Sequence, residues 1–392
     1  MATTKTLNNI VLNSHAYKKF IAPTRIRLPH VTPLTSRGDK PLSFTFQHQL
    51  EALIFLHLQG FESGAALLQA MEEDGFARKH IAPPDGVKKS TFYDAINDRG
   101  LLQLQELFAQ LCQDAGAVVS REFAEFGDLV AVDGSLVEAT LSMHWAEYRK
   151  KNNKFRVHVG FNVNQGIPQK LFLTPGKDGE RPFVSKIVNP GQTGILDRGY
   201  QDHGEFDQWQ EDGRHFVCRI KKRTLKELIT LEQFDMDPET FIFFDAKVRL
   251  GHGQSKTKKP LRVVGYRIAR TEYYVATDRF DLKAEEVATI YKLRWEVEKF
   301  FAWWKKQLNV YHRAKPFIAR SPYGVLVQIF AGLITYLLMA IYCAEQHGER
   351  VSMKRVRQLK TQIQNELRGT HTKQTEAICH QKRPPDELNA RT

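Results

Sequence analysis

Residues 324–343 form an almost uninterrupted apolar run, GVLVQIFAGLITYLLMAIYC, and this run constrains the fold more than any other feature of the sequence. A segment of this length and composition either crosses a membrane or is buried on all sides in the centre of a large domain. Gln328, two glycines and two tyrosines interrupt the run, and no second segment of the chain resembles it. We therefore expect a buried core helix and no membrane partner.

Outside that run the chain is polar and strongly basic. Its 392 residues carry 57 Lys and Arg against 44 Asp and Glu, which gives a formal net charge of +13. Because such a field attracts polyanions, nucleic acid is the leading class of partner, although composition alone does not exclude other anionic partners. The length leaves room for roughly two or three domains.

The cysteines and the first residues indicate the compartment. The four cysteines show no Cys-x-x-Cys spacing, which argues against a zinc cluster and against a disulfide framework. The opening residues lack the apolar core of a secretory signal. We therefore expect a cytoplasmic protein.

The first third of the chain is predicted to be helical. Residues 1–45 are interpreted as an N-terminal arm with no assigned fold, and 46–122 as a helical DNA-binding domain of short helices separated by Gly and Pro. Within it, VKKSTFYDAI could open a recognition helix with Ser90 as N-cap and with three side chains facing DNA, namely Lys88, Lys89 and Tyr93. An ordinary helix with a solvated basic start explains this segment equally well.

The pattern then changes to strands. DLVAVDGS, FRVHVGFNV, PQKLFLT, TGILDRGY and HFVCRIK predict a five-stranded mixed α/β sheet covered by helices over 123–222. Residues 223–282 hold further β-like runs with no room for crossover helices, which predicts an inserted antiparallel β unit. A long helix that begins at Asp281 and the apolar helix occupy 283–348, and 349–392 form a basic C-terminal tail.

Two aspartates follow two of these predicted strands. Asp133 follows LVAV and precedes Gly134-Ser135, and Asp197 follows TGIL and precedes Arg198. We expect a strand end and a sharp turn at each aspartate, so that the two carboxylates converge on one metal. Either aspartate alone would be explained by a turn or a helix cap, so the pair carries the hypothesis.

The long predicted helix supplies a third carboxylate. At about 100° per residue, four of its polar residues fall within roughly 60° of one another around the axis: Tyr291, Arg294, Glu298 and Lys305. A core-facing apolar stripe occupies the adjacent arc. A surface ion pair explains Arg294 and Glu298 taken alone, but not the whole row with its aromatic hydroxyl.

The row Tyr291-x2-Arg294-x3-Glu298-x6-Lys305 resembles the Tyr-Arg-Glu-Lys signature of the insertion-sequence-four family of bacterial DDE transposases, with every spacing kept. The segments VDGS and LDRGY resemble the aspartate motifs of that family. The resemblance covers roughly residues 125–345 and is most specific in the signature helix. It implies a ribonuclease H-like catalytic core interrupted by a β-rich insertion. The residue patterns outside this range add an α-helical N-terminal domain and a helical C-terminal region to the expected fold.

The resemblance also implies a chemistry. Asp133, Asp197 and Glu298 would be catalytic and hold two Mg²⁺ ions, for which Mn²⁺ can substitute because all the ligands are oxygens. Tyr291, Arg294 and Lys305 would bind DNA phosphates. The expected function is cut-and-paste transposition, with cleavage at transposon terminal inverted repeats and strand transfer to target DNA. We also expect a homodimer in the synaptic complex and association with the bacterial nucleoid.

Two alternatives and two local questions stay open. The chain could be an inactive or domesticated protein that binds terminal repeats, or a metal-dependent nuclease without strand transfer. Basic clusters at 149–154, 221–223 and 256–259 could follow a DNA backbone or be solvated loops. A hairpin intermediate with a flipped base is not favoured, because the predicted insertion contains no Trp.

Overall fold

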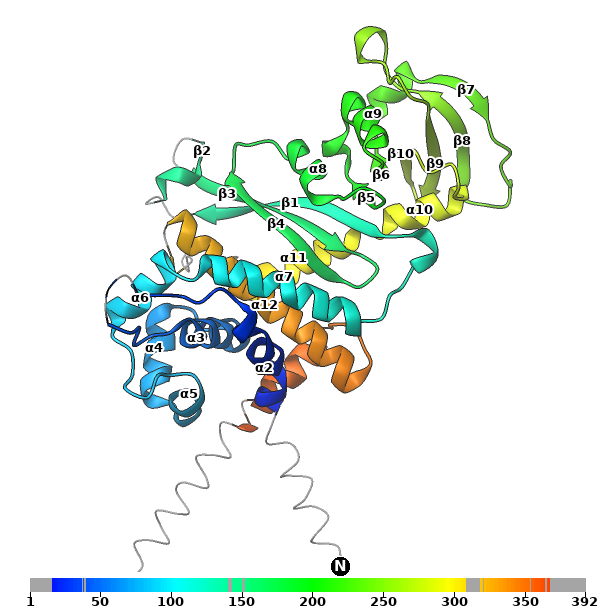
Figure 1. The fold of residues 1–392 in the computed structure, drawn as a ribbon. Helices are drawn as coiled ribbons and strands as arrows, with labels where there is room; N and C mark the ends of the chain where they lie inside the picture. The colour runs from blue at the N-terminus through cyan, green and yellow to red at the C-terminus, as the bar shows by residue number, and fades with distance from the viewer. Residues whose placement is uncertain are drawn as a thin grey trace, which may run out of the picture.

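A sheet with helices on both faces forms the centre of the protein (Figure 1). The computed structural model describes residues 16–366, apart from 37, 39, 140–142, 150–151, 308–317, 320, 353 and 364. One face of the sheet carries α8 (Val184–Ile187) and α9 (His203–Glu211). The other face carries α7 (Leu101–Val118), α10 (Ala284–Lys292), α11 (Trp295–Gln307) and α12 (Pro322–His347).

The strands of the described residues form one ten-stranded mixed sheet in the order β2-β3-β1-β5-β6-β10-β9-β8-β7, with β4 also paired to β3. Among the described strands, only β1–β5 and β5–β6 are parallel pairs. The strands are β1 (Leu129–Ala139), β2 (Glu147–Arg149), β3 (Asn152–Asn162), β4 (Ile167–Pro175), β5 (Thr193–Leu196), β6 (His215–Arg219), β7 (Ile229–Gln233), β8 (Ile242–Arg249), β9 (Leu261–Ile268) and β10 (Thr271–Thr277).

Alternation along the strands divides the interior into two cores. In β1, the side chains of Leu129 and Ala131 enter the larger core, whereas those of Val130 and Val132 enter the smaller one. The smaller core lies under α8 and α9 and contains Trp209. The larger core continues through α12 into the N-terminal helices α2 (Ala16–Arg27), α3 (Phe46–Gln59), α4 (Gly64–Glu73), α5 (Gly75–His80) and α6 (Lys89–Asp98).

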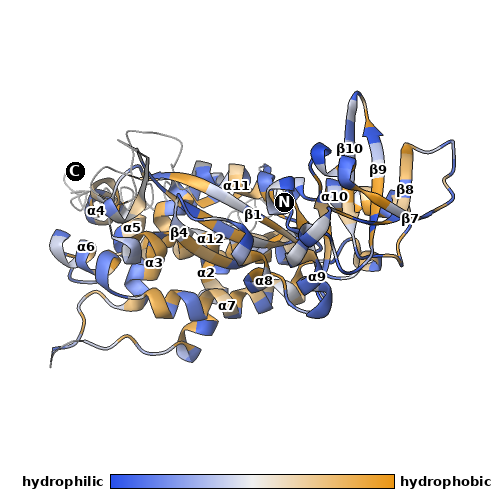
Figure 2. Ribbon diagram, turned by 90° about the horizontal axis from the view of Figure 1, so that it is seen from above, coloured by the Kyte–Doolittle hydropathy of each residue, from blue (hydrophilic) through white to orange (hydrophobic). Residues whose placement is uncertain are grey.

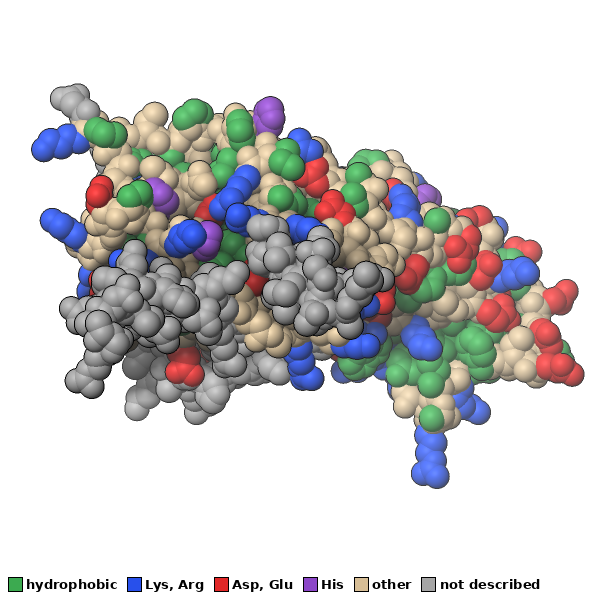
Figure 3. Space-filling view, turned by 90° about the horizontal axis from the view of Figure 1, so that it is seen from below, with side chains coloured by type: hydrophobic (Ala, Val, Ile, Leu, Met, Phe, Trp, Pro, Cys, Tyr) green, Lys and Arg blue, Asp and Glu red, His purple; other side chains and the backbone are tan. Residues whose placement is uncertain are grey.

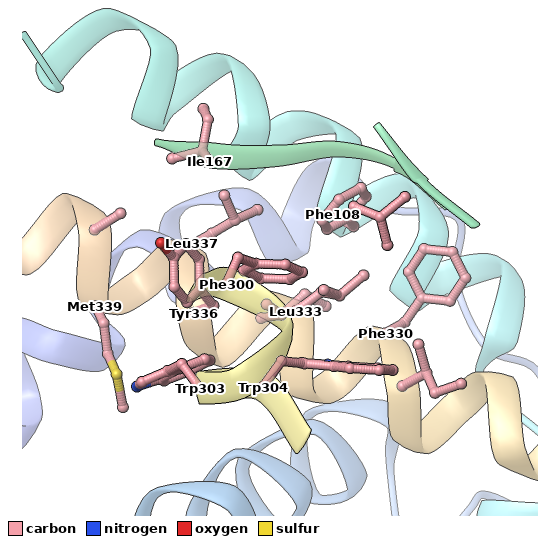
Figure 4. Close-up of a cluster of buried hydrophobic side chains, with 14 of the residues drawn as sticks. Phe108, Ile167, Phe300, Trp303, Trp304, Phe330, Leu333, Tyr336, Leu337 and Met339 are labelled. Carbon is pink, nitrogen blue, oxygen red and sulfur yellow. The ribbon is translucent and has the colours of Figure 1, made fainter. Parts of the chain in front are cut away.

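The apolar run of the sequence is the central helix of the larger core. Among the described residues, α12 alone has the length and composition to cross a membrane, and 94% of its most apolar window is buried inside the protein. Its aromatic and aliphatic side chains pack against Phe300 and Trp304 of α11 and Phe108 of α7 (Figure 4). Apolar residues are concentrated on α12 and the central strands, with hydrophilic residues on outward helix faces (Figure 2).

The β unit differs from the prediction in how it joins the core. Its strands β7 to β10 are antiparallel as expected, but β10 also pairs with β6, with Val275 opposite Arg219. The predicted five strands are therefore extended into one continuous sheet and are not followed by a separate unit. Pairing of this kind covers an edge of β6 that would otherwise leave backbone donors and acceptors free.

The long predicted helix is two helices with a turn between them. At Leu293 and Arg294, i→i+3 hydrogen bonds appear, from Arg294 N to the Tyr291 carbonyl and from Glu296 N to the Leu293 carbonyl. The predicted N-cap, Asp281, is also wrong, because its carboxylate binds Arg279. The N-cap of α10 is Lys283, whose N–H donates to the Glu286 side chain at 2.7 Å.

The segment expected to be an arm contains a helix where no fold was assigned, and the basic C-terminal region is helical in part. In the segment expected to be an arm, α2 buries Tyr17, Phe20 and Ile21. In the basic tail, residues 354–363 are helical and bury Val356, Leu359 and Ile363 against the larger core. In both segments spaced apolar residues supply the packing face. The rest of the tail, 367–392, and the first 15 residues lie outside the described part of the chain.

Candidate active site

The strand register brings Asp133 and Asp197 level with each other. Ala131 of β1 pairs in parallel with Ile195 of β5, and each aspartate lies two residues further along its strand direction. Because side chains alternate, each carboxylate faces the same side as Ala131 and Ile195, which is the side covered by α10 and α11. The two acids therefore point into one layer.

The backbone at Asp133 differs from the expected turn. β1 does not end there but continues to Ala139, paired with β3 throughout, so that Asp133 lies opposite Val159 and Gly134 opposite His158. Asp197 does follow the last residue of its strand, as predicted. The Gly134-Ser135 pair suggested a turn from sequence, but the long ladder to β3 holds these residues in the strand.

The pKa of the Asp133 carboxyl group is shifted by its surroundings. Burial raises its pKa to about 6, opposed by a hydrogen bond from the Gly134 N–H at 2.8 Å and by the charge of Arg294. Glu298 and Asp197 raise it further through repulsion. The three acids of the sequence hypothesis are thus close enough to influence one another electrostatically.

The α10–α11 pair brings the signature row to these acids. The Tyr291 hydroxyl donates to Asp197 Oδ1 at 3.2 Å. One turn later, an Arg294 terminal nitrogen lies 2.6 Å from Glu298 Oε1, with Arg294 almost fully buried. Burial opposes the charge of Arg294, but Tyr291 and Glu298 outweigh it and raise its pKa.

Lys305 lies further along α11 and reaches the same region. Burial lowers its pKa; the charge of Asp133 opposes this shift, whereas that of Lys154 adds to it. An ammonium group is able to form a charge-assisted hydrogen bond with an incoming phosphate. All four residues of the row therefore contact or influence the two strand aspartates, despite the break in the helix.

Two buried polar atoms near the acids have no hydrogen-bond partner within the described part of the chain. These atoms are Tyr200 Oη and Arg294 Nε. Burial raises the pKa of Tyr200, and the charges of Asp133 and Asp197 raise it further, so its ring lies within electrostatic reach of both. Tyr200 was not among the predicted site residues, although its place in LDRGY, three residues after Asp197, was an available signal.

A metal ion fits the chemistry of this donor set, although Asp133, Asp197 and Glu298 do not form a compact cluster. Asp133, Asp197 and Glu298 offer only oxygen ligands, which Mg²⁺ prefers. The unpaired Tyr200 Oη and Arg294 Nε would be able to hydrogen-bond a bridging water in such a site. Across the residues described here, no three His, Cys, Asp or Glu side chains lie close enough together to form a metal cluster. Glu298 instead forms the ion pair with Arg294.

An exposed tryptophan borders the site and was also missed. Trp295 follows Arg294 in the sequence, is 58% exposed, and has the Arg294 guanidinium 5.7 Å from its ring centroid. The ring of an exposed Trp presents a large apolar face and one N–H donor to solvent. Its signal in the sequence was its position next to the signature arginine, off the apolar stripe.

The proposed recognition helix is α6, and its details differ from the expectation. Ser90 is not the N-cap; Lys88 occupies that position without a side-chain cap bond, and α6 begins at Lys89. Lys88 and Lys89 are exposed, whereas Tyr93 is half-buried against Phe92. The lysines are thus free to meet an anion, and Tyr93 mainly contributes to packing.

Comparison with known proteins supplies the family. Residues 124–338 match the family model described as "Transposase DDE domain". The chain is 30% identical over 328 residues to a probable transposase for insertion sequence element IS5377 of Geobacillus stearothermophilus, covering 82% of each protein. It is 28% identical over 203 residues to a putative transposase, y4zB, of Sinorhizobium fredii, covering 50% of this chain and 56% of that protein.

Among solved structures, the chain is similar to the piggyBac transposase in a cryo-EM synaptic complex with hairpin DNA. The TM-score is 0.44 at 10% identity, over 97% of this chain and 86% of that one. This distant likeness does not bear on the assignment, which follows from the family model and the bacterial relatives. The chain belongs to the DDE transposase family, whose members include transposases of insertion sequences.

Proposed function

We propose that this chain is an active transposase that cleaves DNA at transposon ends and joins the ends to target DNA. The observation that carries the proposal is the shared layer of Asp133 and Asp197, with Glu298 on the helix that covers it. Such a site needs no Ser, Cys or His nucleophile, because phosphoryl transfer depends on positioning and charge neutralisation.

We further propose that Asp133, Asp197 and Glu298 hold two Mg²⁺ ions, with Mn²⁺ as a substitute. When bound, these ions would supply activation of the attacking oxygen and stabilisation of the leaving oxygen. The chain would supply the oxygen ligands, and Glu298 would exchange its ion pair with Arg294 for this role. The Tyr291 hydroxyl orients the Asp197 carboxylate.

Arg294, Lys305 and Tyr291 are proposed to bind phosphates of the transposon end. Release of Arg294 from Glu298 would free a guanidinium fork, which binds phosphate through paired hydrogen bonds. Lys305 adds a point charge and Tyr291 a hydroxyl donor. Binding of DNA and metal would thus give both Arg294 and Glu298 a new partner in place of their ion pair.

The larger layout remains part of the proposal. We infer a ribonuclease H-like core, 123–222 and 283–348, with the β-rich 223–282 inserted between its parts. The helical domain 46–122 would bind the terminal repeats, with the arm 1–45 and the tail 349–392 flanking these parts. A homodimer would pair the two transposon ends, and we expect the protein to act on nucleoid DNA in the bacterial cytoplasm.

The experiment is a cleavage and joining assay on DNA that carries the element's own ends. Wild-type protein should produce 3′-OH ends in Mg²⁺ and none in EDTA, and Glu298→Gln should lose them. Glu296→Gln is the matched control, because Glu296 lies on the same helix and pairs with Lys299 at 2.7 Å, away from the acids. Equal loss in both variants would contradict a specific role for Glu298.

One observation favours an inactive DNA-binding protein as the second candidate. The ion pair between Arg294 and Glu298 neutralises the third acid, and the described residues hold no ready metal cluster. Tight binding to the element's ends with no cleavage in Mg²⁺ or Mn²⁺ would support this candidate. Cleavage without joining would instead indicate a nuclease.

A further inference from the structure

Two hollows lie end to end beside the proposed active site. The inner hollow, about 580 Å³, begins at Asp197 and carries four cations: Arg198, Arg219, Lys221 and Lys222. The outer hollow, about 570 Å³, lies between the start of α9 and the 251–259 loop and carries five: Arg181, Lys221, Arg223, Lys256 and Lys258. Lys221 lines both hollows, which together we call the basic trough.

Buried polar side chains fix the backbone near Lys221, the residue that the two hollows share. Gln201 is almost fully buried, accepts from the Lys221 N–H at 2.8 Å and donates to Thr224 Oγ1 at 2.8 Å. Arg181 lines the outer hollow, and its Nε donates to the carbonyl of Gly199, which lines the inner hollow, at 3.1 Å. The backbone at Lys221 is therefore fixed by a hydrogen bond to a buried side chain.

The 251–259 loop is fixed in the same way. The buried Asp207 accepts from the backbone N–H groups of Lys258 and Lys259 at 2.8 and 2.9 Å. His203 Nδ1 lies 2.8 Å from the Ser255 carbonyl oxygen. These contacts hold the backbone of the loop, while the side chains of Lys256 and Lys258 line the hollow.

The acids of the trough are already engaged, whereas most of its cations are not. Asp202 caps α9 and pairs with Arg181, and Glu227 lies 3.4 Å from His252. Within the described part of the chain, no carboxylate lies within ion-pairing distance of four trough cations: Lys221, Arg223, Lys256 and Lys258. The trough thus presents unpaired positive charge to solvent, which suits a polyanion.

This charge is local and not a general property of the strand-rich end. Acidic side chains gather over the end of the molecule formed by β7 to β10 (Figure 3). The loop after β7 carries Asp235, Asp237 and Glu239. A polyanion that reaches Asp197 along the surface would therefore follow the trough and avoid the tip.

We propose that the basic trough binds the phosphate backbone of the DNA strand that leaves the active site at Asp197, outside the transposon end. The inference rests on the proposed function for the identity of the reaction. Eight Lys and Arg residues line the two hollows against five acids, with one tyrosine, Tyr274, in the inner hollow. Contacts of this kind bind DNA irrespective of sequence, as is required for DNA outside the transposon, whose sequence differs at every insertion.

The test is the salt dependence of binding of the full-length protein to an unrelated DNA duplex. Arg223→Gln/Lys258→Gln removes two exposed trough cations, and each lost phosphate contact makes the negative slope of log K against log salt shallower by about 0.9. The double variant should therefore reduce the magnitude of the slope by about 2. Lys226→Gln/Arg270→Gln is the matched control, since both residues are exposed and line neither hollow.

Two reaction assays separate the possible sources of this strand. If the strand is donor flank, the trough variant should lower cleavage of long-flank donors by about tenfold and leave joining of pre-cleaved ends unchanged. If it is target DNA, joining should fall and cleavage should persist. A trough variant with the slope and both activities of the control would overturn the proposal. A slope change in a protein that cuts no DNA would support the trough and contradict the proposed function.

Discussion

A buried ion pair between β8 and β9 should be among the most sensitive points of the fold. Arg262 binds Asp245 through two hydrogen bonds, with Nε–Oδ1 at 2.8 Å and a terminal nitrogen to Oδ2 at 2.7 Å. Both side chains are at most 8% exposed. Arg262 also donates to the carbonyl of Leu282, just before α10, so the pair ties the strand-rich end to the helix that carries Tyr291.

Asp245→Ala should cost about 3–5 kcal/mol of folding free energy, because it leaves a buried guanidinium without its partner. At roughly 2–4 °C per kcal/mol, the thermal midpoint of the affected region should fall by roughly 6–20 °C. By contrast, the double variant Arg262→Met/Asp245→Leu should recover most of the loss, since apolar replacement of both partners is often nearly neutral.

Differential scanning calorimetry of wild type, Asp245→Ala, Asp245→Leu, Arg262→Met and the double variant measures this coupling, with Asp245→Leu and Arg262→Met as the single variants of the cycle. Arg262→Met alone should also be costly, because it leaves the Asp245 carboxylate buried and unpaired. Costs of the single variants that simply add in the double variant would refute the reasoning, as would an Asp245→Ala variant that unfolds within 2 °C of wild type.

Three further predictions concern single side chains. Burial lowers the pKa of His57 to about 4, so the neutral ring contributes stability above pH 6.5 that is lost as the pH falls toward 4. The stability difference between wild type and His57→Phe should therefore shrink by about 2 kcal/mol from pH 7.5 to pH 5 in urea unfolding, and a constant difference would contradict this. Tyr291→Phe removes the hydroxyl bound to Asp197, so cleavage should fall by roughly tenfold, whereas end binding should weaken less, because Arg294 and Lys305 retain their proposed phosphate contacts; wild-type rates would exclude a positioning role. Trp295→Ala should change stability by less than about 0.5 kcal/mol because the ring is exposed, yet weaken binding to ends with unpaired bases by about 1–3 kcal/mol; unchanged affinity would show that the ring contacts no base.

Local patterns carried most of what the sequence could predict. The strands of 123–222 follow from short Val- and Ile-rich runs between turn residues, and the apolar run at 324–343 had to be buried because of its length. The spacing of Tyr291, Arg294, Glu298 and Lys305 carried the family resemblance. The row still meets the two aspartates, because a two-residue turn displaces the second helix without reversing its direction.

Several features of the fold depend on strand pairing between distant parts of the chain, which local sequence patterns do not report. Whether Gly134-Ser135 turns or continues depends on β3, which pairs with β1 along its whole length. The junction of β10 with β6 joins residues nearly 60 positions apart, from Arg219 to Val275. No local pattern encodes such a contact. The burial of α2 similarly depends on the rest of the larger core, which a local propensity does not report.

The most direct test of the central claim replaces each proposed ligand with cysteine and varies the metal. Asp133→Cys, Asp197→Cys and Glu298→Cys should each abolish cleavage of end DNA in Mg²⁺, because a thiolate is a poor ligand for a hard cation. If these residues hold the metal, Mn²⁺ should restore part of the activity, while Glu296→Cys remains active in both metals. Full activity of any of the three variants in Mg²⁺ would contradict the account.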